Sequence, residues 1–362
     1  MAHRITDTDT MFSVRARPWH GLGTVIDTAP TIADAIKLAG LDWRVELEPN
    51  YTYLDGAWVE TPSQSVIKVE RLADGSDFRS VLGSVGPAYT PLQNVDAFKW
   101  FQPWLDAGVA TLETAGSLDG QRRVWVLARI TRDPIVVSGD DEVAAYVLLA
   151  HAHDGSLAVR AGLTPIRVVC HNTLSAAIAG GKVESMFRIS HTSGMRSRLA
   201  DAATAIEVID QRLRDLGEVF QELARSDVKP GDLLDYVAAA YGQTPEDAAK
   251  GRRLAPITEL FESGTGQDLP GARGTVWGLY NALTEFVTHQ AGRGSDSDAN
   301  ARRHFGSVMG DGARVLARGL DAALVLARKS YTLESVFGDH AQIVTDATAA
   351  HPDALILPAR QA

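Results

Sequence analysis

Residues 119–131 read DGQRRVWVLARIT, an Asp-Gly pair followed by the strongest β-strand candidate in the chain. An Asp-Gly pair between β-rich runs favours a type I′ turn, because both central residues of that turn need a positive φ. Further Asp-Gly pairs stand at 55–56, 74–75 and 154–155. The sequence therefore predicts several hairpins and a largely antiparallel sheet.

Helices are expected among these hairpins. Thr31 opens a short helix with capping-box chemistry and Gly40 closes it. Residues 94–107 (NVDAFKWFQPWLDA) predict a second helix with Asn94 as its cap, which Pro103 kinks or shortens. Most of the tryptophans lie before residue 126 and are expected in the core. Residues 1–192 are thus expected to form an α+β domain, an antiparallel hairpin-rich sheet with packed helices.

From Met195 onward the pattern becomes helical, with apolar residues three and four positions apart over 195–225. Such a heptad seam is typical of a coiled-coil dimer or of a long helix in an intramolecular bundle. A polar linker at 292–300 and a helical tail at 301–330 follow, so 193–362 is expected to be an all-helical C-terminal domain. Two domains fit a length of 362 residues. The seam residues are Leu199, Ala202, Ile206, Ile209, Leu213, Leu216, Phe220 and Leu223.

Composition excludes several classes of protein. Hydrophobic residues make up 45% and charged residues 22% of the chain, which is ordinary for a globular protein. The single cysteine, Cys170, rules out a disulfide framework and a multi-thiolate zinc site. Residues 1–10 are polar, unlike a signal peptide, and no run of about 18 apolar residues could span a membrane. A cytoplasmic protein is expected, and no cofactor is expected.

The net charge is −10, but basic residues gather in two segments, 151–200 and 301–330, each with a local net charge of +4. Charge segregation of this kind is typical either of a local anion-binding surface or of an uneven, solvated one. The arginines expected to contact a phosphate backbone are Arg160, Arg167, Arg188, Arg196 and Arg198.

The segment His151-Ala152-His153-Asp154-Gly155 resembles the start of a binuclear metal-hydrolase motif. On a strand, His151 and His153 would point to the same face, as two ligands of one metal ion must. Asp154 is directly adjacent to His153, which departs from the motif, and Asp154-Gly155 belongs to the turn series. The sequence therefore favours a turn whose histidines lie at the surface or contact phosphate. A metal site at His151, His153 and Asp154 is the weaker alternative.

A helix expected at 275–290 carries a possible ligand stripe. Trp277, Asn281, Glu285 and His289 are each four residues apart and line one face. These side chains could stack a base, read its edge or polarise a ligand. The alternative is a polar seam between packed helices.

Several motifs together resemble the phage/plasmid-like protein family, a group classed as a domain of unknown function. The resemblance covers residues 11–330 in order, with one departure: Thr288 precedes His289 where the family leads us to expect an Asp-His pair. The resemblance implies a mobile-element context and no established activity. The motifs are Met11-Phe12-Ser13, Pro18-Trp19-His20-Gly21-Leu22-Gly23, Glu113-Thr114-Ala115-Gly116-Ser117-Leu118 with Arg123-Val124-Trp125, His153-Asp154-Gly155-Ser156, Arg167-Val168-Val169-Cys170 with Asn172-Thr173-Leu174, and Trp277 with Asn281-Ala282 and Thr284-Glu285.

These observations favour nucleic-acid handling in phage or plasmid replication or recombination, most plausibly single-stranded DNA binding or annealing. The expected partners are single-stranded DNA and further copies of the chain, joined through the 195–225 helix. Two alternatives stay open: a metal-dependent hydrolase or nuclease, and a non-enzymatic host-interaction protein.

Overall fold

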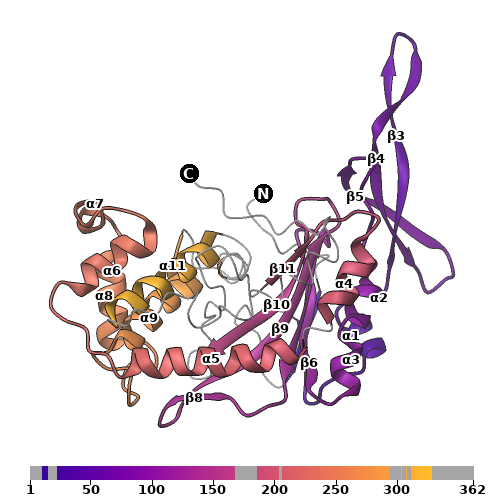
Figure 1. The fold of residues 1–362 in the computed structure, drawn as a ribbon. Helices are drawn as coiled ribbons and strands as arrows, with labels where there is room; N and C mark the ends of the chain where they lie inside the picture. The colour runs from indigo at the N-terminus through magenta and orange to yellow at the C-terminus, as the bar shows by residue number, and fades with distance from the viewer. Residues whose placement is uncertain are drawn as a thin grey trace.

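The structure is a computed structural model that describes residues 10–14, 23–167, 186–203, 206–292, 303, 307 and 311–327. It combines a large sheet, helices packed on that sheet, a helical region beside it and a projecting hairpin (Figure 1). Among the described residues, no helix is long and apolar enough to cross a membrane.

The larger sheet is mixed. Its described strands run in the order β11-β10-β9-β7-β6-β1-β2, and β8 pairs with β9. Most neighbouring strands are antiparallel, but β1 and β2 are parallel, which corrects the expectation of a simple hairpin sheet. The strands are β1 (Met11–Val14), β2 (Thr24–Ile26), β6 (Ala110–Leu118), β7 (Arg123–Ile130), β8 (Ile135–Ser138), β9 (Asp141–Ala152), β10 (Val159–Arg167) and β11 (Met186–Ile189).

Four helices cover one face of this sheet and share its hydrophobic core. The predicted 94–107 helix is two helices, because Pro103 sits in the first turn of the second one, where a missing N–H does no harm. Trp100 and Trp104 share this core with alternate residues of β7 such as Val126. The helices are α1 (Ile32–Leu38), α2 (Asn94–Lys99), α3 (Gln102–Asp106) and α4 (Met195–Ala203).

The helical region has a second core, which continues onto the sheet through Val137, Val143 and Leu163. Helix α5 runs from β8 to the other helices of this region (Figure 1). Helix α9 is its centre: every residue from Val276 to Thr284 is buried. The elements are α5 (Ile206–Ala224), α6 (Asp232–Tyr241), α7 (Pro245–Lys250), α8 (Leu254–Ser263), α9 (Val276–Glu285), the π-helix η1 (Phe286–Gln290) and α11 (Asp311–Leu326).

The predicted 195–225 helix corresponds to two described helices, α4 and α5, which pack on different cores, and residues 204–205 between them lie outside the described residues. The described seam residues Leu199, Leu213, Leu216, Phe220 and Leu223 are buried within the chain. This is the intramolecular packing that one interpretation of the heptad pattern predicted. A homo-oligomer through this helix would have to use another face and stays a prediction. The division at residue 192 also stays a prediction, and the 292–300 linker lies almost entirely outside the described residues.

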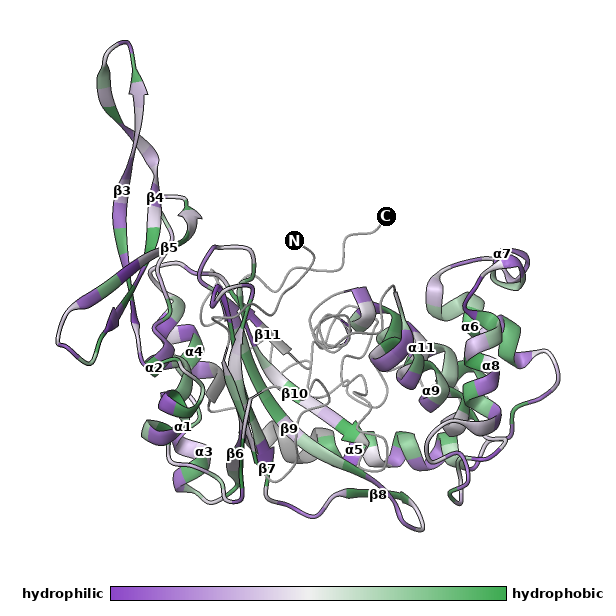
Figure 2. Ribbon diagram, turned by 180° about the vertical axis from the view of Figure 1, so that it is seen from behind, coloured by the Kyte–Doolittle hydropathy of each residue, from purple (hydrophilic) through white to green (hydrophobic). Residues whose placement is uncertain are grey.

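A second sheet, β3 (Arg44–Leu54), β4 (Ala57–Arg71) and β5 (Asp77–Val85), projects from the body (Figure 1). β5 pairs only with residues 64–71 of β4, so residues 49–63 form a two-stranded ribbon, here called the arm. At its end Tyr53 lies opposite Trp58, with ring centroids 5.3 Å apart. Trp58 is 71% exposed, contrary to the expectation that most tryptophans are core. Hydrophobic segments occur on both strands of the ribbon (Figure 2).

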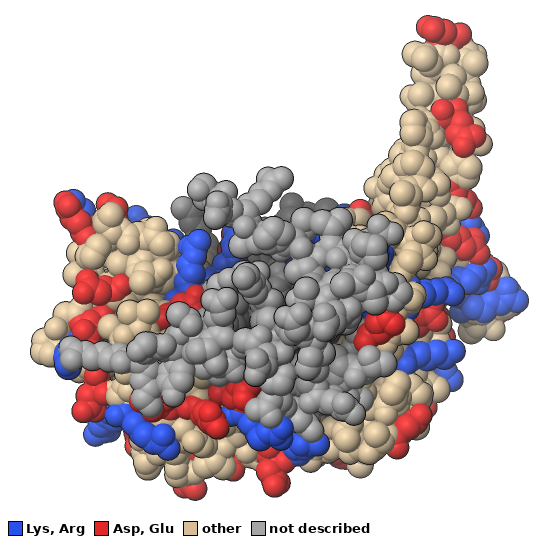
Figure 3. All heavy atoms as spheres, in the orientation of Figure 1, with Lys and Arg blue, Asp and Glu red and all other residues tan. Residues whose placement is uncertain are grey.

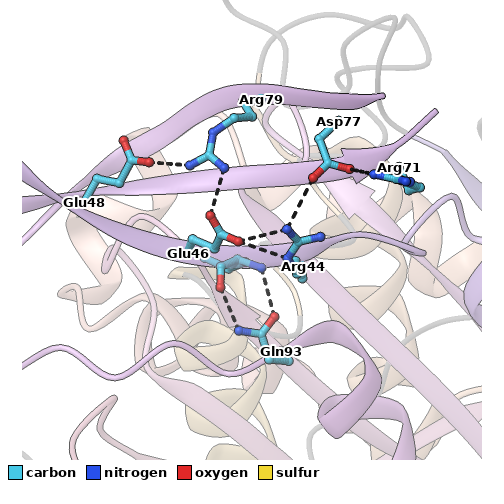
Figure 4. Close-up of polar contacts among 8 residues, drawn as sticks. Arg44, Glu46, Glu48, Arg71, Asp77, Arg79 and Gln93 are labelled. Atoms are coloured by element: carbon cyan, nitrogen blue, oxygen red, sulfur yellow. Dashed lines mark hydrogen bonds and ion pairs between the residues drawn. The ribbon is translucent and has the colours of Figure 1, made fainter. Parts of the chain in front are cut away.

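Charged side chains brace the base of the arm (Figure 4). Gln93 adds a two-point contact: the Val45 N–H donates to its Oε1 and its Nε2 donates to the Val45 carbonyl, both at 2.9 Å. Each exposed ion pair contributes little alone, but a network fixes the direction in which the ribbon leaves the body. The ion pairs join Arg44 with Glu46 and Asp77, Arg71 with Asp77, and Arg79 with Glu46 and Glu48.

Candidate functional site: a buried histidine cluster and an arginine pair

Three histidines meet under the covered face of the larger sheet. His151 lies near the end of β9, His153 directly follows that strand, and His191 follows β11. His151 and His153 point to the same side, as the spacing predicted, and their ring centroids are 4.7 Å apart. The His191 ring lies 5.8 Å from that of His151. All three side chains are buried, so the expectation of surface histidines was wrong.

Hydrogen bonds fix the tautomer of two of these rings. The Asn94 amide N–H donates to the Leu41 carbonyl at 3.0 Å, which leaves Asn94 Oδ1 to accept from His153 Nε2, also at 3.0 Å. His191 Nδ1 donates to the Thr90 carbonyl at 3.2 Å. Four ring nitrogens have no hydrogen-bond partner: His151 Nδ1 and Nε2, His153 Nδ1 and His191 Nε2.

Burial keeps the cluster uncharged near neutral pH. Desolvation lowers the pKa of His153 to about 3 and holds the pKa of His151 well below its ordinary value. It also lowers the pKa of His191, an effect partly offset by the backbone of Thr90 and Leu157. Neighbouring histidines lower the pKa values of His151 and His153 further, because like charges disfavour one another. The rings are therefore available as neutral imidazoles.

Asp154 and Gly155 form the turn that the sequence predicted. Gly155 has φ +75°, and Asp154 Oδ1 accepts from the backbone N–H of Ser156 at 2.9 Å. The turn packs against β5 so closely that a Cβ on Gly83 would lie 2.7 Å from that of Asp154. The Asp154 carboxylate is thus engaged in the turn. Within the described part of the chain, no three His, Cys, Asp or Glu side chains are placed to hold a metal ion as they stand.

The predicted ligand stripe on residues 277–289 is internal. Trp277 and Asn281 are fully buried; Trp277 Nε1 donates to Asp141 Oδ2 at 2.8 Å, and Asn281 Nδ2 donates to the Trp277 carbonyl at 2.8 Å. Glu285 accepts from the backbone N–H of Thr265 at 3.0 Å. His289 is half-buried in η1. A helix that is buried all round has no free face, so these side chains join helices to each other and to the sheet, as the alternative interpretation predicted.

The candidate arginines do not form one patch. Arg160 on β10 lies directly opposite Arg188 on β11, so both side chains project from the same face of the sheet. Arg198 Nη2 donates to the Ser190 carbonyl at 3.3 Å, which places Arg198 next to the end of β11. Arg196 is exposed and forms an ion pair with Asp96 at 3.2 Å. Arg167 stands seven residues from Arg160 on β10, roughly 23 Å along the strand.

A shallow cavity of about 710 Å³ lies beside η1 in the helical region. Phe286 and Val287 contribute apolar surface, and Arg252 and Arg253 contribute positive charge. Arg253 stacks on the ring of Tyr241 at 4.3 Å, which orients its guanidinium. No local sequence pattern predicts this cavity, because its residues come from α6, η1, α11 and the segment before α8.

Sequence reasoning also missed His191 and Asn94. Asn94 was predicted as a helix cap, but Gln93 occupies the cap position and Asn94 is buried against His153. His191 stands 38 positions beyond His153 and had no spacing signal of its own. The structural link is β11, which ends two residues before this histidine.

These features define a mixed α and β protein with a buried imidazole cluster and an arginine-bearing strand pair at one side of its main sheet. The chain belongs to the family described as Domain of unknown function (DUF932), whose model matches residues 81–307. The matched range includes the histidine cluster, Asn94 and the arginine pair, whereas the arm at 49–63 precedes it. No curated protein and no solved structure matches the chain significantly.

Proposed function

We propose that this chain binds single-stranded nucleic acid through the β10–β11 side of its main sheet. The observation that carries the proposal is the Arg160–Arg188 pair. Two arginine side chains placed directly opposite each other on neighbouring strands project from the same face of the sheet, so an anion lying across the two strands can contact both. A phosphate backbone is an anion of the required kind.

Arg196 and Arg198 on α4 add positive charge beside the end of β11. Val159, Ala161 and Ile189 face the core that α4 shares, so Arg160 and Arg188 project from the other face of the sheet, and a strand that contacts all four arginines passes round the β11 edge. The four cationic side chains are enough for a short run of phosphates. Arg188 and Arg196 are exposed, while Arg160 and Arg198 are half-buried and better fixed in position. Arg167 is not part of this surface, because it stands at the other end of β10.

The net charge of −10 sets the conditions under which such binding occurs. Acidic surface elsewhere repels the polyanion, so we expect moderate affinity that falls steeply with salt. In Figure 3, acidic and basic side chains lie close to one another in several places along the lower edge and at the base of the arm. The resemblance to phage/plasmid-like proteins supports replication or recombination of a mobile element as the process served.

Fluorescence anisotropy with labelled single- and double-stranded oligonucleotides tests the proposal. Arg188→Glu is the test variant, because Arg188 is exposed on the edge strand of the described sheet and its replacement leaves the core intact. Arg225→Glu, a charge reversal of another exposed arginine at the end of α5, is the matched control. We expect single-strand binding that Arg188→Glu weakens about tenfold, the equivalent of one charge-assisted contact, and that Arg225→Glu leaves within about twofold. No binding at low salt, or equal losses in both variants, contradicts it.

A protein-interaction role is the second candidate, and the arm favours it. Tyr51, Tyr53 and Trp58 are exposed on a braced ribbon, and aromatic side chains dominate the energetics of protein interfaces. The arm carries Asp55 and Glu60 near its end, which suits a protein partner better than a phosphate backbone. Trp58→Ser distinguishes the two roles of the arm. If oligonucleotide binding survives this change, the arm is not needed for nucleic-acid binding and is left for a protein partner. If binding is lost, the arm belongs to the nucleic-acid surface.

A further inference from the structure

The arm carries its exposed aromatic side chains on one face. Tyr51 lies opposite Glu60 on the neighbouring strand, and Tyr53 lies opposite Trp58. Residues that are opposite each other or two apart along a strand project to the same side, so these four side chains share one face of the ribbon. Each of the three aromatic side chains is more than half exposed. An exposed apolar face of this kind indicates a surface that another molecule covers.

The arm is also acidic. Residues 49–63 contain Asp55 and Glu60 and neither lysine nor arginine. Glu60 belongs to the aromatic face, and Asp55 lies in the turn at the end of the ribbon. In Figure 3 the arm is tan and red, and blue side chains begin at its base. A complementary surface for this face is therefore hollow, apolar and basic.

The cavity beside η1 has these properties. Phe286, which is buried, contributes apolar lining, and the exposed Arg252 and Arg253 contribute positive charge. Neither arginine forms an ion pair with another described residue. The acidic side chain of the lining, Asp311, is already paired with Arg314. A volume of about 710 Å³ is within the range that accommodates a drug-sized ligand, so it has room for an aromatic side chain.

The arm and the cavity lie at opposite ends of the molecule. Figures 1 and 2 show the arm leaving the body on the side of α2, with α6, α8 and α11 at the other end. The ion pairs at the base of the arm hold it in a direction that leads away from the cavity of its own chain. A second copy of the chain can bring the two features together. Such a contact joins two different surfaces, so it repeats from copy to copy into a ring or a filament.

We propose that the arm of one copy docks into the cavity beside η1 of a second copy. Trp58 packs against the apolar lining, and the carboxylates of the arm lie beside Arg252 and Arg253. The exposed parts of the three aromatic side chains amount to about 300–450 Å², less than the roughly 800 Å² per partner of a standard interface. The association is therefore reversible, with a dissociation constant in the micromolar range. The inference develops the second candidate function, and it does not rest on nucleic-acid binding.

Sedimentation velocity of the nuclease-treated full chain, over about a hundredfold range of protein concentration, tests the proposal. We expect the parent chain to sediment faster as its concentration rises. Trp58→Ser and Arg253→Glu should each weaken this association by at least about tenfold, because one removes the aromatic anchor and the other reverses the complementary charge. Both side chains are exposed, so we expect both variants to fold.

Two matched controls should associate as the parent chain does. Val59→Ser changes the opposite face of the arm, where Val59 lies across from Thr52. Arg225→Glu reverses the charge of an exposed arginine that does not line the cavity.

A mixture of the two deficient variants distinguishes this contact from one between two arms. Trp58→Ser keeps an intact cavity, and Arg253→Glu keeps an intact arm. Together they can form one contact and no second one, so we expect a one-to-one complex that does not grow further. A contact between two arms would instead leave Arg253→Glu associating with itself.

Three results overturn the proposal. The first is a parent chain that stays monomeric at every concentration, which leaves the arm to a different partner. The second is an Arg253→Glu variant that associates as the parent does, which places the contact away from the cavity. The third is a mixture of the two deficient variants that forms no complex.

Discussion

The contact between Trp277 and Asp141 joins the central helix of the helical region to the main sheet, so its removal should be costly. Both side chains are fully buried, and Trp277 Nε1 donates to Asp141 Oδ2 at 2.8 Å. Trp277→Phe keeps an aromatic ring against Phe220 but removes the indole N–H. A lost hydrogen bond to a buried carboxyl group costs about 1.5–3 kcal/mol, and the smaller ring adds about 1 kcal/mol for the space it leaves. The expected loss is therefore about 3 kcal/mol.

Equilibrium urea unfolding followed by far-UV circular dichroism measures this loss. Trp58→Phe is the matched control: the same replacement at a side chain that is 71% exposed should change the free energy of unfolding by no more than about 0.5 kcal/mol. The reasoning is refuted if Trp277→Phe costs less than about 1 kcal/mol, the typical net value for a single neutral hydrogen bond. It is equally refuted if the two variants cost the same.

Three further predictions concern pH and packing. The pKa of His153 falls from its ordinary value to about 3 on folding, so on acidification the unfolded chain takes up a proton that the folded chain does not. The contribution to stability is therefore complete above about pH 6.5 and is lost below it at up to about 1.4 kcal/mol per pH unit. Urea unfolding at pH 7, 6 and 5 should show this decline, and a flat profile would contradict it. Asp321 behaves oppositely: burial raises its pKa to about 7, so its ionisation in the unfolded chain lowers stability as the pH rises from about 4 to about 7. Asp321→Asn should therefore stabilise the protein by about 1–2 kcal/mol at pH 8, after allowance for partial exposure, and by less than half of that at pH 5. Gly83→Ala should destabilise by about 1–3 kcal/mol, because the new Cβ would lie 2.7 Å from the Cβ of Asp154, and unchanged stability would show that the turn moves freely.

Local chemistry explains the parts of the fold that the sequence predicted well. Thr31 caps α1 by accepting from the Asp34 N–H at 3.2 Å, and Gly40 ends that helix at φ +62°. The hairpin turns at 55–56 and 119–120 have positive φ at both residues, as a type I′ turn requires. At 74–75 and 154–155 only the glycine does, so those turns are of another kind. Caps and turns depend on neighbours in the chain, which is why a single sequence shows them.

The features missed depend on contacts between distant segments. The parallel pairing of β1 with β2, and the packing of α4 and α5 on different cores, follow from the tertiary contacts of each element. The exposure of Trp58 follows from β5 ending short of the arm, which no pattern within β4 reveals. In the candidate site, the spacing of His151 and His153 placed them on one face correctly. His191 and Asn94 join them only through strand order, so the composition of the cluster was not predictable.

The salt dependence of single-stranded oligonucleotide affinity tests the central claim most directly. Each phosphate contact contributes about −0.7 to the slope of log K against log salt concentration for single strands, so four arginines predict a slope of about −2 to −3. Replacing Arg160 and Arg188 together by Gln should make the slope less negative by about 1.4. Binding whose slope is the same in the parent chain and in this double variant, or no binding at low salt, would show that the β10–β11 arginines do not hold a phosphate backbone.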